Sequence, residues 1–337
     1  MQNATRSLFN AYLARIAQLN GVDSAGQKFA ATPAVQQKLE DRLLEQSDFL
    51  SSINVIGVDN QGGEKLGLLG TELIGSTADT ASGTERQTFD PTSLDAVGYF
   101  CSQTNFDTHI RYALLDAWRH LPNFQEKVRD FILKAQALTR IAIGFNGMSR
   151  AATSDRGANP LMQDVNIGWL QKYRDHAANR VMTESTAAQG TVTYGASGDY
   201  KNLDSLVYDA VSNLIEPQYS ESTDLVVLVG RGLLHDKYFN VLNRDTPPTE
   251  MVASDKVMST RRLGELPALR IPYFPANTLM VTPLSNLSIY WQKETRRRHV
   301  MDNPKLDRVE NYESTNEAYV VEDYAGGCVV ENITKAD

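Results

Sequence analysis

The amino-acid sequence predicts an α+β fold, and three observations carry this prediction. Residues 123–143 have apolar side chains at helical spacing. Residues 225–229 form an apolar run of strand length between two helical patterns. Short strand patterns separated by prolines follow, and residues 307–333 alternate apolar and polar side chains. This mixture favours α+β over a doubly wound sheet.

The composition is that of a folded globular protein. The chain has 337 residues, of which 42% are hydrophobic and 22% charged, so disorder throughout, collagen-like repeats and a coiled-coil rod are excluded. This length predicts roughly two domains. No apolar run approaches the roughly 18 residues of a membrane helix. The net charge of −8 argues against a dedicated nucleic-acid binder, because such a protein needs a basic surface.

The two cysteines, Cys101 and Cys328, are too few and too far apart for a disulfide framework or a zinc site. The N-terminus lacks the continuous apolar region of a secretory signal. We therefore expect a reducing compartment, with the cytoplasm as the default location.

The N-terminal residues predict a short helix followed by a polar connection. Residues 7–19 carry apolar side chains at helical spacing, with Thr5 or Ser7 as the N-cap and Gly21 as the C-terminal stop. Residues 21–28 are small and polar, which makes them a candidate for proteolysis. The alternative interpretation is a frayed helix on a domain surface.

Residues 35–50 predict a second helix, which Thr32 would cap and Pro33 would begin. The composition then changes, because residues 57–98 are rich in glycine, serine and threonine and contain few large apolar side chains. Such a segment cannot form its own core, and structureless loops of this length are uncommon inside compact domains. It predicts a projecting hairpin whose partners lie on another chain. A disordered insertion is the alternative.

Two more helices are predicted before the middle of the chain. The first covers residues 108–120. The second, residues 123–143, has Asn123 as its N-cap and Gly144 and Gly147 as its stop, and it would be about 30 Å long. Its stripe is typical of a core rather than a cofactor site, and consists of Phe124, Val128, Phe131, Ala135, Leu138 and Ala142.

The second half of the chain predicts an amphipathic helix over residues 203–214 that ends before Pro217. A buried strand at 224–230 and a helix at 231–242 follow, and then strands at 268–273, 279–282 and 287–291. The tail predicts a terminal hairpin that turns at Gly326 and Gly327 and pairs back onto an earlier part of the chain.

No catalytic, cofactor-binding or metal-binding residue is predicted. The sequence after residue 229 begins like a dinucleotide fingerprint, but His235 stands where the third glycine is needed. Residues 147–151 lack the final glycine of a nucleophile elbow, and the five histidines show no metal-ligand spacing. The alternative function is a cytoplasmic α/β enzyme of unknown class with a cleft beside the 224–230 strand. Loss of a defined activity on replacing Asp224 or His235 would favour this alternative.

One concentrated basic feature remains, at Arg296, Arg297, Arg298 and His299, together with the Arg261–Arg262 pair. Arginines in such a group suit phosphate or carboxylate partners. The acidic residues of a second copy that we consider as partners are Glu310, Glu313, Glu317, Glu322 and Asp323. A solvated face is the alternative.

Six runs of sequence resemble a known family. They are FNAYL at residues 9–13, GTERQ at 83–87, GFNG at 144–147, QDV at 163–165, GWLQKYR at 168–174 and NPKLDRVENYES at 303–314. With them, the chain resembles the major capsid proteins of tailed phages with the Hong Kong 97 fold, and more closely those of the peduovirus-type myophages. The similarity runs nearly end to end.

This resemblance implies a structural protein of the virion that self-assembles, as hexamers and pentamers, into an icosahedral head shell around packaged double-stranded DNA. The implied partners are further copies of the chain, an internal scaffolding protease, the portal protein and DNA bound without sequence specificity, with no membrane and no cofactor. Assembly would take place in the host cytoplasm. The protease would trim the N-terminus near Phe29 and Ala30.

The resemblance also implies a division of the chain. Residues 1–29 would be the cleavable segment, 30–57 an N-terminal arm and 58–98 the extended projecting loop. Residues 99–167 and 291–337 would form a peripheral domain with the spine helix at 123–143, and residues 168–290 an axial domain. The candidate intersubunit contacts are Glu85, Arg86, Arg296, Arg297 and Arg298. Related shells sometimes crosslink through a lysine and an asparagine, but we expect no crosslink at Lys65.

Overall fold

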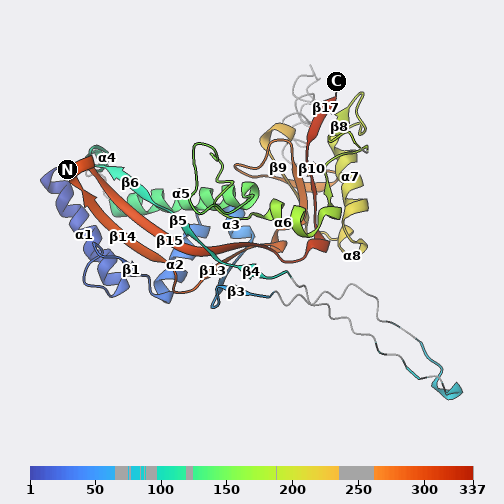
Figure 1. Cartoon of the computed structure of the whole chain (residues 1–337), viewed down its shortest axis with the longest axis horizontal. Coiled ribbons are helices and arrows are strands. Elements are labelled where there is room, and N and C mark those ends of the chain that lie inside the picture. The colour runs from blue at the N-terminus through green and yellow to red at the C-terminus, as the bar shows by residue number, and fades with distance from the viewer. Residues whose placement is uncertain are drawn as a thin grey trace, which may run out of the picture.

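The computed structural model describes residues 1–64, 75, 77–83, 85–86, 88, 97–118, 124–186, 188–234 and 262–336. In this part of the chain, helices and mixed sheets occur together, as the α+β prediction requires. A larger sheet and the long helix α5 occupy the left and centre of Figure 1, and a second sheet with its own helices lies at the right.

The larger sheet has seven strands within the described residues and is organised around β15 (Arg308–Val321). One path through the sheet runs β1-β14-β15-β13-β2, and β5 and β6 also pair with β15. The β13–β2 pair is parallel, whereas every pair that β15 makes is antiparallel. The bounds of its other strands are β1 Phe29–Ala30, β2 Asn54–Val58, β5 Ser102–Asn105, β6 Thr108–Arg111, β13 Leu287–Gln292 and β14 Arg297–Asn303.

Helices α1 (Asn3–Asn20), α2 (Pro33–Leu44), α3 (Asp48–Ser52), α4 (Tyr112–Trp118) and α5 (Phe124–Asn146) belong to the same part of the molecule. The largest apolar core joins α2, α3 and α5 to β13 and β15, with Leu43, Ile141 and Tyr319 among its fully buried members. A separate core lies under α1 and includes Phe9, Ile132 and Val309.

The second sheet has six strands in the described range, in the order β10-β11-β9-β12-β16-β7. Their bounds are β7 Val181–Met182, β9 Leu225–Val229, β10 Arg262–Leu263, β11 Leu266–Arg270, β12 Leu279–Pro283 and β16 Cys328–Val330. This sheet packs with α7 (Leu203–Leu214), and the core between them includes Leu206, Val227 and Val281. Helices α6 (Trp169–His176) and α8 (Pro217–Ser220) complete this part.

The remaining elements are short. Two strand pairs stand apart from the sheets, β3 (Gly62–Gly63) with β4 (Tyr99–Phe100) and β8 (Val192–Gly195) with β17 (Ile333–Ala336). The 3₁₀ turns are η1 Thr80–Ser82, η2 Ala178–Arg180, η3 Leu284–Asn286, η4 Pro304–Leu306 and η5 Tyr324–Gly326.

The predicted first helix is confirmed as α1, which starts four residues earlier than expected and ends at Gly21 in the left-handed conformation (φ 65°). The predicted caps Thr5 and Ser7 are wrong, because both lie inside the helix and Gln2 occupies the N-cap position. The single helix expected over residues 35–50 is also wrong. The chain forms α2 and α3, and the Ser47 hydroxyl accepts from the Leu50 amide to start α3.

The first part of the helix predicted over residues 108–120 is a strand in the structure. Residues Thr108–Arg111 pair with β15 as β6, and the helix α4 begins only at Tyr112. The local pattern suits either structure, and the long-range pairing with residues 308–311 decides between them.

The long helix is confirmed as α5, but its predicted apolar stripe is only partly buried, since Val128 and Ala142 are buried while other described members are not. Phe131 is 53% exposed, whereas Ile132, Gln136 and Arg140 are buried. Of the two glycines predicted to stop the helix, Gly144 lies inside α5, whereas Gly147 directly follows its last residue, Asn146. At Gly144 a methyl group would overlap the Trp169 ring, so this glycine permits close packing rather than a helix end.

In the second half, α7 and strands β9, β11, β12 and β13 confirm the predicted elements, with ends shifted by up to a few residues. Residues 231–234 begin the predicted helix, and residues 235–242 lie outside the described residues. The predicted terminal hairpin is wrong, because β15 belongs to the larger sheet and β16 pairs with β12 and β7 in the other. Gly326 and Gly327 therefore lie where the chain passes between sheets.

Candidate functional site: a buried charge cluster, a docked N-terminal helix and a projecting ribbon

Five buried charged side chains meet between α2, α5 and the β14–β15 pair, and we call them the charge cluster. They are Glu40, Arg140, Arg296, Glu313 and Glu317. Arg140 donates from Nη1 to Oε2 of Glu40 at 2.6 Å and from Nη2 to Oε1 of Glu317 at 2.5 Å. Arg296 donates from Nη1 to Oε1 of Glu40 at 2.6 Å. Glu40 thus links two arginines that are far apart in the sequence.

Arg296 also donates hydrogen bonds to other members of the cluster and to Gln136. The Arg296 Nε donates to Glu313 Oε1 at 2.7 Å, and its Nη2 donates to Gln136 Oε1 at 2.9 Å. The Gln136 amide donates in turn to Glu313 Oε2 at 2.8 Å. Each charged side chain of the cluster is at most 4% exposed. A buried charge is tolerated only when it is paired in this way, so the cluster fixes the positions of four separate segments.

Burial and pairing act in opposite directions on the carboxyl groups of the cluster. Burial raises the pKa of Glu313, but the charges of Arg296 and Arg298 outweigh it and lower the pKa to about 2. The pKa of Glu40 is likewise lowered, because Arg140 and Arg296 outweigh its burial. In Glu317, burial outweighs Arg140 and the pKa is raised. The cluster has three carboxyl groups for two arginines, and Glu317 is the one that holds a proton most readily.

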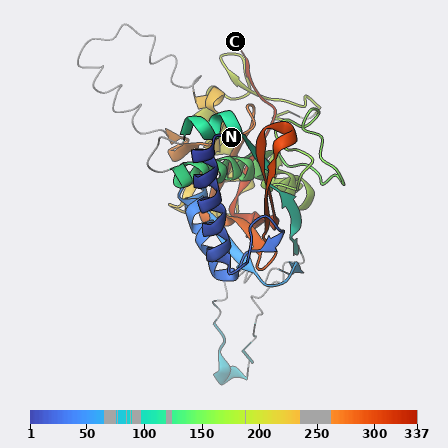
Figure 2. The ribbon, with the colours of Figure 1, turned by 90° about the vertical axis from the view of Figure 1, so that its left-hand side faces the viewer.

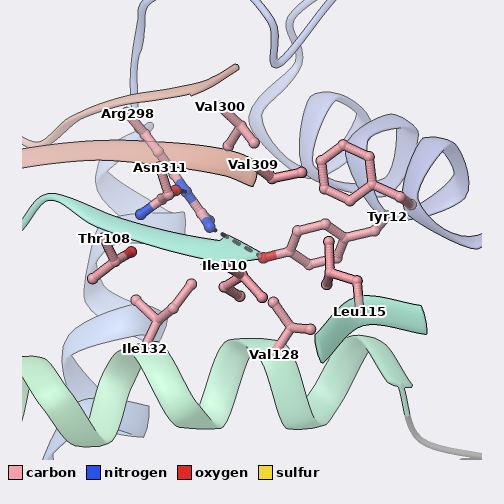
Figure 3. Close-up of a pocket in the computed structure, with 11 residues that line it drawn as sticks. Tyr12, Thr108, Ile110, Leu115, Val128, Ile132, Arg298, Val300, Val309 and Asn311 are labelled. Atoms are coloured by element: carbon pink, nitrogen blue, oxygen red, sulfur yellow. Dashed lines mark hydrogen bonds between the residues drawn. The ribbon is translucent and has the colours of Figure 1, made fainter. Parts of the chain in front are cut away.

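Helix α1 is docked against the larger sheet through one face. Phe9, Tyr12 and Ile16 are buried, and they meet Ile110, Leu115, Val128, Ile132, Val300 and Val309. Figure 3 shows Tyr12 pointing into this space toward Arg298, whose Nη2 donates to the phenol oxygen at 3.1 Å. A cavity of about 20 Å³ remains among these side chains.

The chain leaves α1 through a connection that is also attached. The Val300 amide donates to the Ala25 carbonyl at 3.1 Å, and His299 Nε2 lies 3.1 Å from the Gly26 carbonyl oxygen. Phe29 and Ala30 form β1 at the edge of the larger sheet, opposite Arg298 and Arg297. Phe29 is buried and Ala30 is exposed. The predicted processing residues thus lie in a paired two-residue strand.

Strands β3 and β4 pair at the base of the predicted loop, and we call the described residues between 58 and 98 the ribbon. The cyan turn η1 lies far from both sheets in Figure 1. The described residues at positions 75, 77–81, 83, 85, 86 and 88 are all exposed, Glu85 and Arg86 among them. At the root of the ribbon, Phe100 is 62% exposed and Ile56 is 42% exposed. Lys65 lies outside the described residues.

The predicted basic group is not a single surface. Arg296 does not fit the predicted intersubunit role, because its side chain is 2% exposed and pairs with Glu40 and Glu313 of its own chain. Arg298 is half-buried beside Tyr12 and Asn311. Its Nε donates to the side-chain oxygen of Asn311 at 2.8 Å. Arg297 is exposed on β14. Arg262 is exposed on β10, and Arg261 lies outside the described residues.

The other predicted acidic partners are also engaged within the chain. Glu310 accepts from Arg308 at 2.7 Å, and Glu317 accepts from Arg140. Glu322 accepts from the Tyr290 hydroxyl at 2.9 Å, and Asp323 accepts from the Tyr219 hydroxyl at 2.6 Å. The partners described for these four residues belong to the same chain.

The described residues contain no group of three or more His, Cys, Asp or Glu side chains that could hold a metal ion. His109 and His176 are exposed, and His299 contacts the Gly26 carbonyl. Asp224 is exposed beside β9, while His120 and His235 lie outside the described residues. Within the same ranges, no helix combines the length and the apolar character needed to cross a bilayer.

Sequence reasoning missed Glu40, Gln136 and Arg140. They lie at polar positions of two amphipathic helices, which normally face water. Arg140 meets carboxylates 100 and 177 positions away in the sequence. No local signal identifies such a residue.

The comparisons with known proteins agree with one another. The family model described as phage major capsid protein, P2 family, matches residues 8–333. The capsid protein of Escherichia phage P2 is 52% identical over 100% of this chain and 96% of its own length. The major capsid protein of Serratia phage KSP20 is 39% identical over 100% of this chain and 98% of its own length.

Solved structures give the same result. A chain of the satellite phage P4 procapsid, which includes the size determination (Sid) protein, is 48% identical, with a TM-score of 0.82 over 100% of this chain and 99% of that one. A chain from the capsid of an empty GTA particle is 16% identical with a TM-score of 0.50 over 86% of this chain and 90% of that one. The second match bears on the fold alone.

Proposed function

The chain belongs to the P2 family of phage major capsid proteins, and on this premise we propose how its parts serve the shell. It is a major capsid protein, a structural component of the phage virion that forms the head shell, and its fold is of the Hong Kong 97 type. The family supports this structural role and not the α/β enzyme considered from the sequence.

The proposed assembly is an icosahedral shell of hexamers and pentamers, in which each ribbon of residues 58–98 lies over a neighbouring subunit. One observation carries this proposal. The described residues of the ribbon around η1 lie away from both sheets, and those at positions 59–64, 75, 77–81, 83, 85, 86 and 88 are exposed in the single chain. A segment of this composition gains a core only from another molecule. Isologous or ring-like contacts between copies would supply that core.

The charged residues Glu85 and Arg86 on the ribbon and Arg297 on β14 are the contacts that we propose between subunits. All three are exposed, so pairing with another copy costs little desolvation. Such rim charges set register and association rate more than affinity. Arg298 is a weaker contact candidate, because Tyr12 and Asn311 already accept from it.

The division of labour among the segments is also a proposal. Residues 30–57 would act as the arm, residues 99–167 and 291–337 as the peripheral domain and residues 168–290 as the axial domain. The sheet beside α7 supports this division, because it has an apolar core of its own. The core around α5 and β15 also includes Leu228, Met280 and Val329 of the second sheet, and so packs the two parts together. The charge cluster joins the arm, through Glu40, to α5 and β15 of the peripheral domain.

We further propose that a scaffolding protease trims the chain near Phe29 and Ala30 during assembly in the host cytoplasm. Portal protein and packaged DNA would be the other partners, with DNA bound without sequence specificity. The acidic net charge of −8 supports weak contact with DNA.

Coexpression of the chain with its scaffolding protein, followed by electron microscopy, tests the assembly. We expect closed shells, and small oligomers alone would contradict the proposal. The double reversal Glu85→Lys with Arg86→Glu should prevent shell closure while the thermal unfolding of the subunit stays unchanged, because both residues are exposed. Glu221→Lys, at another exposed position, is the control. Normal shells from the double variant would exclude these two residues as contacts.

A further inference from the structure

The N-terminal helix is held by side-chain contacts that do not depend on the peptide bond after Phe29. Its anchors Phe9, Tyr12 and Ile16 are at most 8% exposed. Phe29 belongs to the same core. If the chain is cut between Phe29 and Ala30, every one of these anchors stays on the small fragment.

Polar contacts add to this attachment along its whole length. The Gln2 amide donates to Asp116 Oδ1 at 3.0 Å, and Arg6 Nη1 lies 3.0 Å from Asp302 Oδ2. Tyr12 accepts from Arg298, and Ala25 accepts from the Val300 amide. The fragment would be basic, with Arg6, Arg15 and Lys28 against Asp23. Of its cations, Arg6 pairs with an acidic side chain of the rest of the subunit.

The surface beneath α1 is an apolar groove that release would expose. Ile110, Leu115, Val128 and Ile132 rise from β6, α4 and α5, and Val309 closes the groove from β15 (Figure 3). In Figure 2, α1 (dark blue) runs lengthwise along this part of the molecule. Exposing so many contiguous apolar side chains to water is unfavourable.

The bond itself lies in a part of the segment that can open alone. β1 has two residues and pairs only with β14 at the sheet edge, and Ala30 is exposed. Short edge strands open locally at low free-energy cost while their surroundings stay folded. A protease can therefore bind this strand without displacing α1 from its groove.

We propose that residues 1–29 remain bound to the trimmed subunit as a peptide ligand, with α1 in the groove formed by β6, α4, α5 and β15. The inference rests on the proposed trimming near Phe29 and Ala30. Trimming then converts a covalent attachment into a non-covalent one and leaves the groove covered.

Mass spectrometry of denatured shells tests this binding. Shells are assembled from the full chain with its scaffolding protease and washed by gel filtration. We expect about one small fragment for each trimmed subunit, the ratio of a specific one-to-one site. The mass of the large fragment reports the cut independently. Trimmed subunits without the small fragment would overturn the inference and leave the proposed trimming intact.

Two variants separate binding from physical trapping inside a shell. Ile16→Asp places a charge on the buried face of α1, where Ile16 is 6% exposed, and Leu19→Asp places the same charge where Leu19 is 52% exposed. We expect the first to lose about nine-tenths of the fragment or more and the second to retain it. Equal retention by both variants would indicate trapping and overturn the inference.

If the scaffolding protease leaves the chain uncut, the proposed trimming is refuted. The binding of α1 in the groove can still be tested by a cut made at another place. A recognition sequence for a site-specific protease is inserted after Asp23, in the exposed connection, and the soluble subunit is cut there. Co-elution of the α1 fragment with the subunit in gel filtration supports the groove, and separation of the two overturns it. The same pair of aspartate variants serves as the control.

Discussion

The guanidinium group of Arg140 on α5 donates to Glu40 on α2 at 2.6 Å, and both side chains are 1% exposed. The same guanidinium group donates to Glu317 on β15. One side chain therefore ties the segment proposed as the arm to the long helix and the central strand, with water excluded from the contact.

The first prediction concerns the loss of one charge from this contact. Glu40→Gln removes the carboxylate to which both Arg140 and Arg296 donate, although Glu317 and Glu313 still pair with them. We expect the free energy of unfolding to fall by about 1.5 to 3 kcal/mol through the lost charged hydrogen bonds. Glu45→Gln, on the exposed Arg42–Glu45 pair just after the same helix, should change it by less than about 0.5 kcal/mol. Urea unfolding of the subunit measures both. Equal effects would contradict a structural role for the cluster.

The second prediction concerns acid. Glu313 has its pKa lowered from 4.5 to about 2, because the charges of Arg296 and Arg298 outweigh its burial. The folded state therefore binds fewer protons there than the unfolded state, and the stabilisation is lost as pH falls from about 4.5 toward 2. Glu317 has a raised pKa and so acts in the opposite direction, above this range.

Unfolding measured between these pH values checks the acid dependence. Glu313→Gln should flatten the decline, since the group that takes up the proton is gone. The variant is expected to be less stable than the original chain at neutral pH and closer to it in acid. An unchanged slope would show that the acid dependence comes from other carboxyl groups.

The third prediction tests the close packing of α5 against α6. A methyl group at Gly144 would overlap the Trp169 ring, so Gly144→Ala should destabilise the fold by about 1 to 3 kcal/mol. A methyl group at Gly232 would meet open space, so Gly232→Ala should be neutral or slightly stabilising. Thermal unfolding compares the two, and similar midpoints would contradict the packing argument.

The fourth prediction concerns the hydrogen bond between Arg298 and Tyr12. Tyr12→Phe removes the acceptor of a charged donor, which costs about 1.5 to 3 kcal/mol. We expect faster hydrogen exchange of the amides in α1, because its docking is weakened. Tyr208→Phe, at a position that is 69% exposed, should leave the exchange rates of α1 unchanged. If both variants exchange alike, the bond does not hold the helix.

The fifth prediction concerns the two thiols. Burial raises the pKa of Cys101 to about 12, with a further contribution from Glu317, and burial also raises the pKa of Cys328 to about 12. Both side chains are 0% exposed. A thiol-reactive dye at pH 8 should therefore label neither residue in the folded subunit and both after denaturation. Rapid labelling of the native protein would contradict the burial of the thiols.

Much of the fold is predictable from local patterns. Residues 123–143 and 203–214 have the periodicity of helices that bury one face, and α5 and α7 confirm them. The strand β9 has an uninterrupted apolar run, as expected of a strand whose residues are nearly all buried. Gly21 stops α1 because it adopts the left-handed conformation.

The errors have a common physical cause. Thr108 to Arg111 became a strand because of β15, and Gln136 and Arg140 became buried because Glu313 and Glu317 lie opposite them. Each outcome depends on residues more than 150 positions away. The apolar periodicity of a helix locates its core face only when all buried residues are apolar, and the charge cluster violates that condition.

The central strand β15 also has a mechanical consequence. It runs lengthwise through the larger sheet and is bonded to β14 and β6 at one end, β5 in the middle and β13 at the other. The hydrogen bonds of antiparallel pairs run perpendicular to the strand. Tension along β15 therefore acts on these hydrogen bonds in shear, and it acts on all of them at the same time. Under outward pressure on a shell, this axis of the subunit would be the stiff one, and strain would collect at the short edge strands.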